Sequence, residues 1–425
     1  MMKDVKYFHG KDFKAKWLAD DIIRKYHIKT MDDSEEVYIY NKGVYIPSET
    51  IIKQEVQKAL HEDASKNRAS EVEGHVKRST YISRELFNKP LNLINLKNGI
   101  LDLNKNKIMK HSPEFLFTIQ LPIYFKPNAE CPNFKKFIHQ TLTKETHKLI
   151  QELFGYLLWK NYEYQYAIIF FGEGSNGKTT LLNVIIKFVG SENISHISLH
   201  EMGSSRFSSA ELYGKLANIY ADLSDKELDD TSLFKQITGG DKVKGEKKFK
   251  NPFYFSNYAK LFFSANRIPA TSDDTHAFYR RWILVKFPFT FTEEKGNPNL
   301  INELTTNEEL SGILNWAVEG LQRLHKNKKF SNHLTLKEIK DLYIKESNPI
   351  LLFVQSLLSA DMNSWTSKRE LYEAYVFFCK ENNYPVVEDN VFGRKVKPYI
   401  LALSPFISGS RHGYIDGWKG LKIGL

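Results

Sequence analysis

Residues 172–179 read Gly-Glu-Gly-Ser-Asn-Gly-Lys-Thr, which fits the phosphate-binding pattern GxxxxGK[ST] at every constrained position. The apolar run YAIIFFG leads into this loop, and the helical pattern TLLNVIIKFVG follows it. The sequence therefore predicts a buried strand, a glycine-rich turn and a helix. Later apolar runs also alternate with helical stretches, which favours an α/β core with a parallel sheet and crossover helices.

This loop carries the groups that bind a nucleoside triphosphate. Its glycines let backbone N–H groups turn toward phosphate oxygens, and the helix N-terminus adds partial positive charge. We expect Lys178 to reach the β- and γ-phosphates and the Thr179 hydroxyl to bind Mg²⁺, so ATP and Mg²⁺ are the expected cofactors. The predicted nucleotide-binding residues are Gly172, Glu173, Gly174, Ser175, Asn176, Gly177, Lys178, Thr179 and Thr180.

Two later apolar runs end in polar side chains that an ATPase requires. Asp222 ends the strand-like segment LANIYAD, and Asp225 follows three residues later. We expect Asp222 to be the acid on the metal side and Asp225 to support it. Asn266 ends AKLFFSAN, where its amide can hold the attacking water. A solvated strand end and a turn-forming Asn are the alternatives, and the order after the phosphate loop favours the catalytic interpretation.

Two adjacent arginines, Arg280 and Arg281, precede the strand-like segment WILVKFPF. A ring-shaped ATPase needs a cation delivered across the subunit boundary to stabilise charge on the transferring phosphoryl group. One of the two arginines could supply it. The alternative is a pair of surface arginines that flank a strand.

A lysine-rich segment lies between the acidic strand end and Asn266. Residues 242–250 contain five lysines and one glutamate around Gly245, which predicts a basic hairpin. Lysine contacts with phosphates would give sequence-independent, salt-sensitive DNA binding, and the formal net charge of +10 also favours a polyanionic partner. A solvated charge run is the alternative. The candidate DNA-binding residues are Lys242, Lys244, Lys247, Lys248 and Lys250.

Composition and pattern define the remaining regions. We expect an N-terminal α+β domain over 1–130, the ATPase domain over 131–326, and a winged helix over 335–425, where two helices precede a glycine-spaced end. The segment PNAECP is a candidate hinge.

Cys131 and Cys379 lie far apart and make no disulfide framework. The beginning of the chain has no apolar signal region and no apolar run could span a membrane, so we expect a cytoplasmic protein.

The order of phosphate loop, acidic strand end, basic hairpin, strand-Asn and Arg-Arg resembles the superfamily 3 helicases. The amino-acid sequence of these motifs is most similar to the phage and plasmid primase–helicase family, which includes poxvirus nucleoside triphosphatases. The segments that carry the resemblance are FGEGSNGKTT, QITGGDKVKGEKKFK, KLFFSANRIP, AFYRRWILVKFPF and SKRELYEAYVFFCKENNY. The stretch INLKNGILDLN with SPEFLFTIQLPIYF resembles the domain that precedes the ATPase in that family.

The resemblance implies an AAA+-like core that forms a homo-hexameric ring around DNA. ATP would lie between subunits, with Lys178, Thr179, Asp222 and Asn266 on one side and Arg281 on the other. The basic hairpin would face single-stranded DNA in the channel, and the C-terminal domain would bind the duplex origin. The N-terminal domain would serve oligomerisation or the entrance of DNA.

Two features depart from the family pattern. The acidic strand end reads Asp-Leu-Ser-Asp in place of two adjacent acids, which leaves the catalytic base open. The residues before the ATPase are too few for a primase, so a primase would be a separate partner. The leading hypothesis is a replicative or initiator helicase of a phage, plasmid or genomic island. The alternatives are a DNA-stimulated origin-binding or packaging ATPase without strand separation, and a nucleotide-dependent scaffold.

Overall fold

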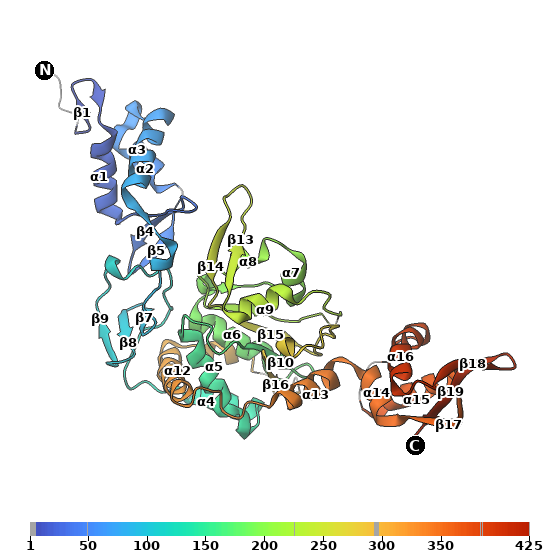
Figure 1. Ribbon diagram of the computed structural model, residues 1–425. Helices are drawn as coiled ribbons and strands as arrows, with labels where there is room; N and C mark the ends of the chain where they lie inside the picture. Colours follow the sequence, from blue (N-terminus) through green and yellow to red (C-terminus); the bar gives the residue numbers. More distant parts are fainter. Residues whose placement is uncertain are drawn as a thin grey trace. The chain divides into compact units, whose positions relative to one another are not determined.

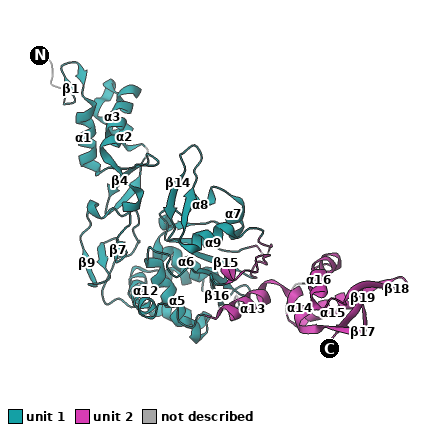
Figure 2. Ribbon diagram, in the orientation of Figure 1, with its two compact units in different colours: residues 1–223, 229–266, 280–333 teal, residues 224–228, 267–279, 334–425 magenta. Residues whose placement is uncertain are grey.

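The computed structural model describes residues 6–48, 50–224, 226–292, 297–382, 384 and 386–424. The chain forms two compact units, which Figure 2 shows in different colours. Unit 1 consists of residues 1–223, 229–266 and 280–333, and unit 2 consists of residues 224–228, 267–279 and 334–425. Unit 2 therefore takes two short segments from the region in which we expect the ATPase domain. Among the described helices, none has both the length and the apolar character that crossing a membrane requires.

The N-terminal part of unit 1 packs three helices against a four-stranded sheet with the order β5-β4-β3-β6. The polar stretch 62–78 is mostly helical, since α3 begins at Lys66. Ser65 caps this helix by accepting a hydrogen bond from the backbone N–H of Arg68, and Val72 and Val76 bury one face. The elements are β1 (Phe8–His9), β2 (Asp12–Phe13), α1 (Ala15–Tyr26), β3 (Lys29–Met31), β4 (Val37–Asn41), β5 (Val44–Pro47), α2 (Ile51–Leu60), α3 (Lys66–Thr80) and β6 (Tyr81–Ile82).

A three-stranded antiparallel sheet follows, formed by β7 (Leu93–Leu96), β8 (Gly99–Asp102) and β9 (Lys107–Met109). Ile94, Leu96 and Leu101 of this sheet belong to the same hydrophobic cluster as side chains of the helices after residue 130, whereas Leu93 and Ile100 belong to a smaller cluster. The boundary that we expect at residue 130 therefore does not separate two cores. The candidate hinge also lies against helix α12 (Asn307–Asn327), because the Asn315 side chain donates hydrogen bonds to the carbonyls of residues 126, 127 and 129.

The central sheet of unit 1 is parallel throughout, as the sequence predicts, and has the order β11-β12-β15-β10-β16. The strand that leads into the phosphate loop, β10, therefore does not pair with the acidic strand β12. Strand β15 lies between them and pairs with both. The strands are β10 (Ala167–Phe171), β11 (Ile194–Ser195), β12 (Ala217–Tyr220), β15 (Lys260–Ala265) and β16 (Trp282–Lys286).

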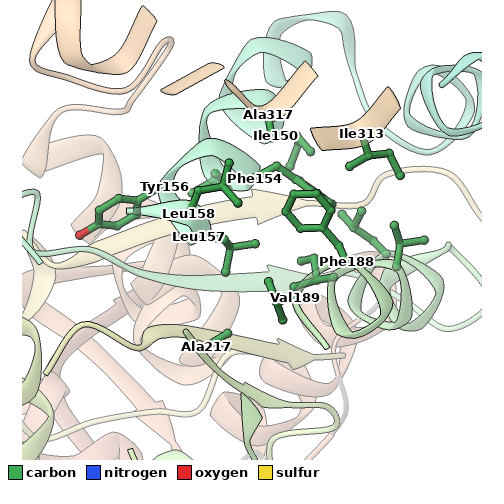
Figure 3. Packing of buried hydrophobic residues seen from close by; sticks show 14 of the residues in the cluster. Ile150, Phe154, Tyr156, Leu157, Leu158, Phe188, Val189, Ala217, Ile313 and Ala317 are labelled. Carbon is green, nitrogen blue, oxygen red and sulfur yellow. The ribbon is translucent and has the colours of Figure 1, made fainter. Parts of the chain in front are cut away.

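Helices bury the apolar faces of this sheet (Figures 1 and 3). Phe154 of α5 and Phe188 of α6 meet with ring centroids 5.4 Å apart. Gly155 and Gly320 let α5 and α12 approach closely, since a Cβ at Gly155 would lie 2.5 Å from the backbone N of Leu321. The helices of this part are α4 (Pro132–Thr141), α5 (His147–Leu158), α6 (Lys178–Val189), α7 (Leu199–Ser204), α8 (Ser208–Glu211), α9 (Ser232–Gly239), α11 (Leu300–Leu304) and α12 (Asn307–Asn327).

The lysine-rich segment forms the hairpin that the sequence predicts. Strand β13 (Lys242–Gly245) pairs antiparallel with β14 (Phe253–Ser256), with Lys242 opposite Ser256 and Gly245 opposite Phe253. Phe253 and Phe255 are buried, and both pack against the Tyr213 ring with centroids 5.4 and 5.5 Å apart. The base of the hairpin is therefore anchored in unit 1, while its tip extends away from the sheet (Figure 1).

In its described residues, the main segment of unit 2 combines four helices with a small antiparallel sheet of order β17-β19-β18. Its core contains Phe353, Tyr375 and Phe392, and the rings of the last two stack at 4.4 Å. Helix α16 follows α15, and the hairpin β18–β19 then closes the sheet (Figure 1). The elements of unit 2 are α10 (His276–Tyr279), α13 (Leu336–Ser347), α14 (Pro349–Leu357), β17 (Leu358–Ser367), α15 (Lys368–Glu381), α16 (Asp389–Leu403), β18 (Ser408–His412) and β19 (Ile415–Ile423).

Candidate nucleotide-binding site and basic hairpin

A cavity of about 390 Å³ lies where the carboxyl ends of β10, β12 and β15 meet. The parallel sheet brings the ends of these three strands to one edge, which is where α/β proteins bind ligands. The cavity joins the predicted residues Lys178, Thr179, Asp222 and Asn266 in one place. Its lining comprises Gly174, Ser175, Asn176, Gly177, Lys178, Thr179, Thr180, Ala221, Asp222, Ser264, Ala265 and Asn266.

The backbone of the phosphate loop requires glycine at two positions. Gly172 has a φ of +142°, and a Cβ there would lie 2.5 Å from the carbonyl oxygen of Phe287. Gly177 has a φ of +92°, and its Cβ would lie 2.8 Å from a methyl group of Thr141. Helix α6 begins at the next residue, so its first N–H groups face the loop. This cradle fits phosphate oxygens.

The Lys178 side chain is held inside the loop. Its Nζ donates hydrogen bonds to the carbonyl oxygens of Gly172 (2.6 Å) and Glu173 (2.8 Å), and to Oδ1 of Asn176 (3.1 Å) and Asn266 (3.4 Å). Burial lowers the pKa of this ammonium group, and the Asp222 carboxylate opposes that effect. Lys178 therefore lies where it can contact phosphates, with an acid close enough to affect its charge.

Asn176 is a residue of the loop whose contribution the motif alone does not reveal. Its side chain is 2% exposed, and its Nδ2 donates to the carbonyl oxygen of Phe287 at 3.4 Å. Its Oδ1 accepts from both the backbone N–H and the Nζ of Lys178. Asn176 thus links the loop to the segment after β16 and orients the lysine. The pattern GxxxxGK[ST] leaves this position open, so the motif carries no signal for it.

Asp222 follows β12 with a φ of +65°, a left-handed conformation that Asp tolerates better than most residues. The N–H of Leu223 donates to the carbonyl oxygen of Ser264 at 2.8 Å, which fixes this turn beside the end of β15. Asp225, the predicted supporting acid, lies outside the described residues.

The donor set fits Mg²⁺ held together with phosphates. Within the described ranges there is no group of three or more His, Cys, Asp or Glu side chains that could hold a metal by themselves. Magnesium commonly takes one or two protein oxygen ligands, with phosphates and water completing the octahedron. The Thr179 hydroxyl and the Asp222 carboxylate, which line the same cavity, match that arrangement.

The two arginines lie at the opposite edge of the sheet. The backbone N–H of Ala167, the first residue of β10, donates to the carbonyl oxygen of Arg281 at 2.7 Å. Arg281 is 7% exposed, whereas Arg280 is exposed and donates from Nη1 to Oε1 of Gln165 at 2.9 Å. The structure therefore does not bring either arginine into the cavity of its own chain.

The predicted DNA-binding lysines of the hairpin differ in their surroundings. Nζ of Lys242 lies 2.9 Å from a carboxylate oxygen of Glu85, and Nζ of Lys247 lies 2.6 Å from one of Glu36. Both acids belong to the N-terminal part of the chain. Lys244 pairs with Glu246 of the hairpin itself at 2.6 Å. The lysines at the tip are exposed, and they are Lys247, Lys248 and Lys250.

Arg84 supports this contact between the N-terminal part and the hairpin. It binds both carboxylate oxygens of Asp33, at 2.6 and 2.7 Å, and its guanidinium lies 4.3 Å from the Tyr213 ring and 4.1 Å from the Phe253 ring. No sequence motif contains Arg84, Glu36 or Glu85. No local pattern indicates them, because their partners are far away in the chain.

Three protein-family models match parts of this chain. The family model "D5 N terminal like" matches residues 5–143, and "Poxvirus D5 protein-like" matches residues 345–415. A family of unknown function, DUF5906, matches residues 170–281, which contain the cavity and the hairpin. Each model therefore covers less than half of the chain.

Solved structures of the C-terminal region of NrS-1, described as apo structures, share the fold. Two of them have TM-scores of 0.53 and 0.54, cover 96% of this chain and 100% of the other chain, and are 13% identical to it. At this identity the likeness shows the fold alone. The matches at the two ends of the chain make it similar to D5-type proteins in these two regions.

Proposed function

We propose that this protein is an ATP-hydrolysing DNA replication protein of the D5 type, and that it acts as a helicase. The observation that carries the proposal is the joint placement of Lys178, Thr179, Asp222 and Asn266 around one cavity at the carboxyl edge of a parallel sheet. A phosphate loop, a metal-side acid and a polar side chain that can position water are the parts that ATP hydrolysis requires.

Each of these residues has its own role in ATP hydrolysis. The N–H groups of the loop and the Lys178 ammonium bind phosphate oxygens, while Thr179 and Asp222 would hold Mg²⁺. When bound there, Mg²⁺ would supply positive charge against the β- and γ-phosphates. The Asn266 amide orients the attacking water at the γ-phosphate. The insertion of β15 between β10 and β12 places this amide between the loop and the acid, which supports an AAA+-like core of the superfamily 3 type.

The cation for the transition state would come from a neighbouring subunit of a homo-hexameric ring. Arg280 and Arg281 lie at the amino edge of the sheet, away from the cavity of their own chain. An arginine that reaches across a subunit boundary must be exposed. Arg280 meets this condition and Arg281, at 7% exposure, does not. We therefore assign the role to Arg280, in place of the Arg281 that the family resemblance favours.

The fold of the main segment of unit 2 supports its assignment as a winged-helix domain that binds duplex DNA. After α13, the order of one helix (α14), a strand (β17), two helices (α15 and α16) and a closing hairpin (β18–β19) matches that module. In such modules the second helix of the pair enters the major groove. Helix α16 takes that position here and exposes the basic side chains Arg394, Lys395 and Lys397. Single-stranded DNA would bind the hairpin β13–β14 in the channel of the ring.

Strand displacement on a forked duplex tests the proposal. We expect ATP hydrolysis that single-stranded DNA stimulates, together with displacement that requires ATP and Mg²⁺. DNA-stimulated hydrolysis without displacement would favour an origin-binding or packaging ATPase. An absence of hydrolysis with a folded, DNA-binding protein would contradict the enzymatic proposal.

A further inference from the structure

We infer that Phe249, at the tip of the hairpin β13–β14, is a stacking platform for an unpaired nucleobase. The inference rests on the proposed function and adds a base-contacting residue to it. Phe249 is 103% exposed, so its ring contributes nothing to the core of unit 1. A fully exposed phenyl ring has no folding benefit, because apolar surface stabilises a fold only when it leaves water.

The backbone at Phe249 gives a second reason to expect a function. The N–H of Lys250 donates to the carbonyl oxygen of Lys247 at 3.2 Å, which closes a turn with Lys248 and Phe249 at its centre. Phe249 has a φ of +61°, in the left-handed region. Gly or Asn usually occupies the third position of a turn with positive φ. Phe is therefore a poor choice for the turn itself, and the local structure does not explain it.

The surroundings of the ring define the ligand. Lys247, Lys248 and Lys250 flank it and are exposed, so a phosphate backbone can pass on either side. Combining lysines with an exposed aromatic ring is how proteins bind single strands without sequence preference, since every base has a flat face to stack. A duplex keeps those faces stacked inside. The chemistry therefore selects single-stranded nucleic acid.

The stem of the hairpin holds the ring in place. Two antiparallel strands pair in register from Lys242–Ser256 to Gly245–Phe253, and the buried Phe253 lies four residues beyond Phe249. The platform is thus carried on a stem that is packed at its base, with the Phe249 ring exposed at its tip. A base that stacks on Phe249 would be held at a defined distance from the sheet.

The test compares two strands of equal length and charge, oligo(dT) and a fully abasic strand, by fluorescence anisotropy with the full-length protein. Phe249→Asn removes the ring and suits the turn, so the fold remains intact. We expect this variant to lose about tenfold in affinity for oligo(dT) and nothing for the abasic strand. Phe249→Trp should retain the wild-type affinity. ATP hydrolysis without DNA should be unchanged, because Phe249 is not among the residues that line the nucleotide cavity.

A matched control separates stacking from charge. Lys248→Ala should weaken both strands alike and lower the salt slope of log K by about 0.7, whereas Phe249→Asn should leave the slope unchanged. Equal affinity of wild type and Phe249→Asn for oligo(dT) would overturn the inference and leave the proposed function standing. An equal loss on both strands would also overturn it, since the ring would then act through the turn. A wild-type protein that binds neither strand would overturn both proposals.

Discussion

Nζ of Lys178 lies 3.4 Å from Oδ1 of Asn266, although 88 positions separate the two residues in the chain. The contact exists because β15 pairs directly with β10, with Ala265 opposite Phe171, so the residues that follow the two strands meet at one edge. The candidate phosphate-binding lysine and the candidate water-positioning amide are therefore neighbours. This arrangement allows their contributions to ATP hydrolysis to be tested separately.

Lys178→Ala should reduce ATP hydrolysis by about 100-fold or more, because the loop then lacks the cation that contacts the phosphates. Phosphate release measures the effect, and thermal unfolding checks that the protein is folded. Lys187→Ala is the control, since Lys187 is an exposed lysine of the same helix. Turnover of the Lys178 variant near the wild-type rate would contradict the assignment.

Asn266→Ala should leave nucleotide binding within a fewfold of wild type and lower turnover by about 100-fold, because the amide acts on the attacking water. Binding of a fluorescent ATP analogue and single-turnover hydrolysis separate the two effects. If binding and turnover fell in parallel, Asn266 would serve only to hold Lys178, and the proposed role in catalysis would be wrong.

Arg280→Ala should bind ATP normally and hydrolyse it poorly, and mixing it with Lys178→Ala should restore part of the activity. The rescue arises because some interfaces in a mixed ring contain both an intact loop and an intact arginine. Arg281→Ala should instead lower the melting temperature, since Arg281 is buried. An active, folded Arg280 variant beside an inactive, folded Arg281 variant would reverse our choice.

Glu36→Gln should strengthen binding of single-stranded DNA by up to about fivefold at low salt. The Glu36 carboxylate pairs with Lys247 at 2.6 Å, so a phosphate must compete with it for the lysine. A pair with this exposure is worth about 1 kcal/mol or less, which limits the gain. Glu62→Gln, an exposed acid of the same part of the chain, serves as the control and should have no effect. A matching gain in both variants would indicate only a change in net charge.

Arg394→Ala combined with Lys397→Ala should weaken duplex binding and lower its salt slope by about 1.8, at about 0.9 for each lost phosphate contact. ATP hydrolysis without DNA should be unaffected. Lys144→Ala with Lys148→Ala, which removes two exposed lysines of unit 1, provides the matched control. Identical slopes for wild type and the Arg394/Lys397 variant would exclude α16 from the duplex interface.

The sequence by itself determined the features that depend on near neighbours in the chain. The apolar run before Gly172, the glycine pattern of the loop and the helix after it all lie within about two dozen residues, and each has a local physical cause. The same holds for the hairpin around Gly245, where alternating side chains and a turn specify antiparallel pairing. The parallel sheet could be predicted because strands and helices alternate.

Only the tertiary structure decided which of these elements meet. Strand order places Asn266 between the loop and Asp222. Both arginines lie at the amino edge of the sheet and therefore do not line that cavity. The pairing of Lys247 with Glu36 joins residues 211 positions apart. Such contacts arise from the packing of whole elements, and no local preference of either residue encodes its partner. One hydrophobic cluster contains residues from both sides of residue 130 for the same reason, because hydrophobic burial depends on which surfaces touch and not on their order in the chain.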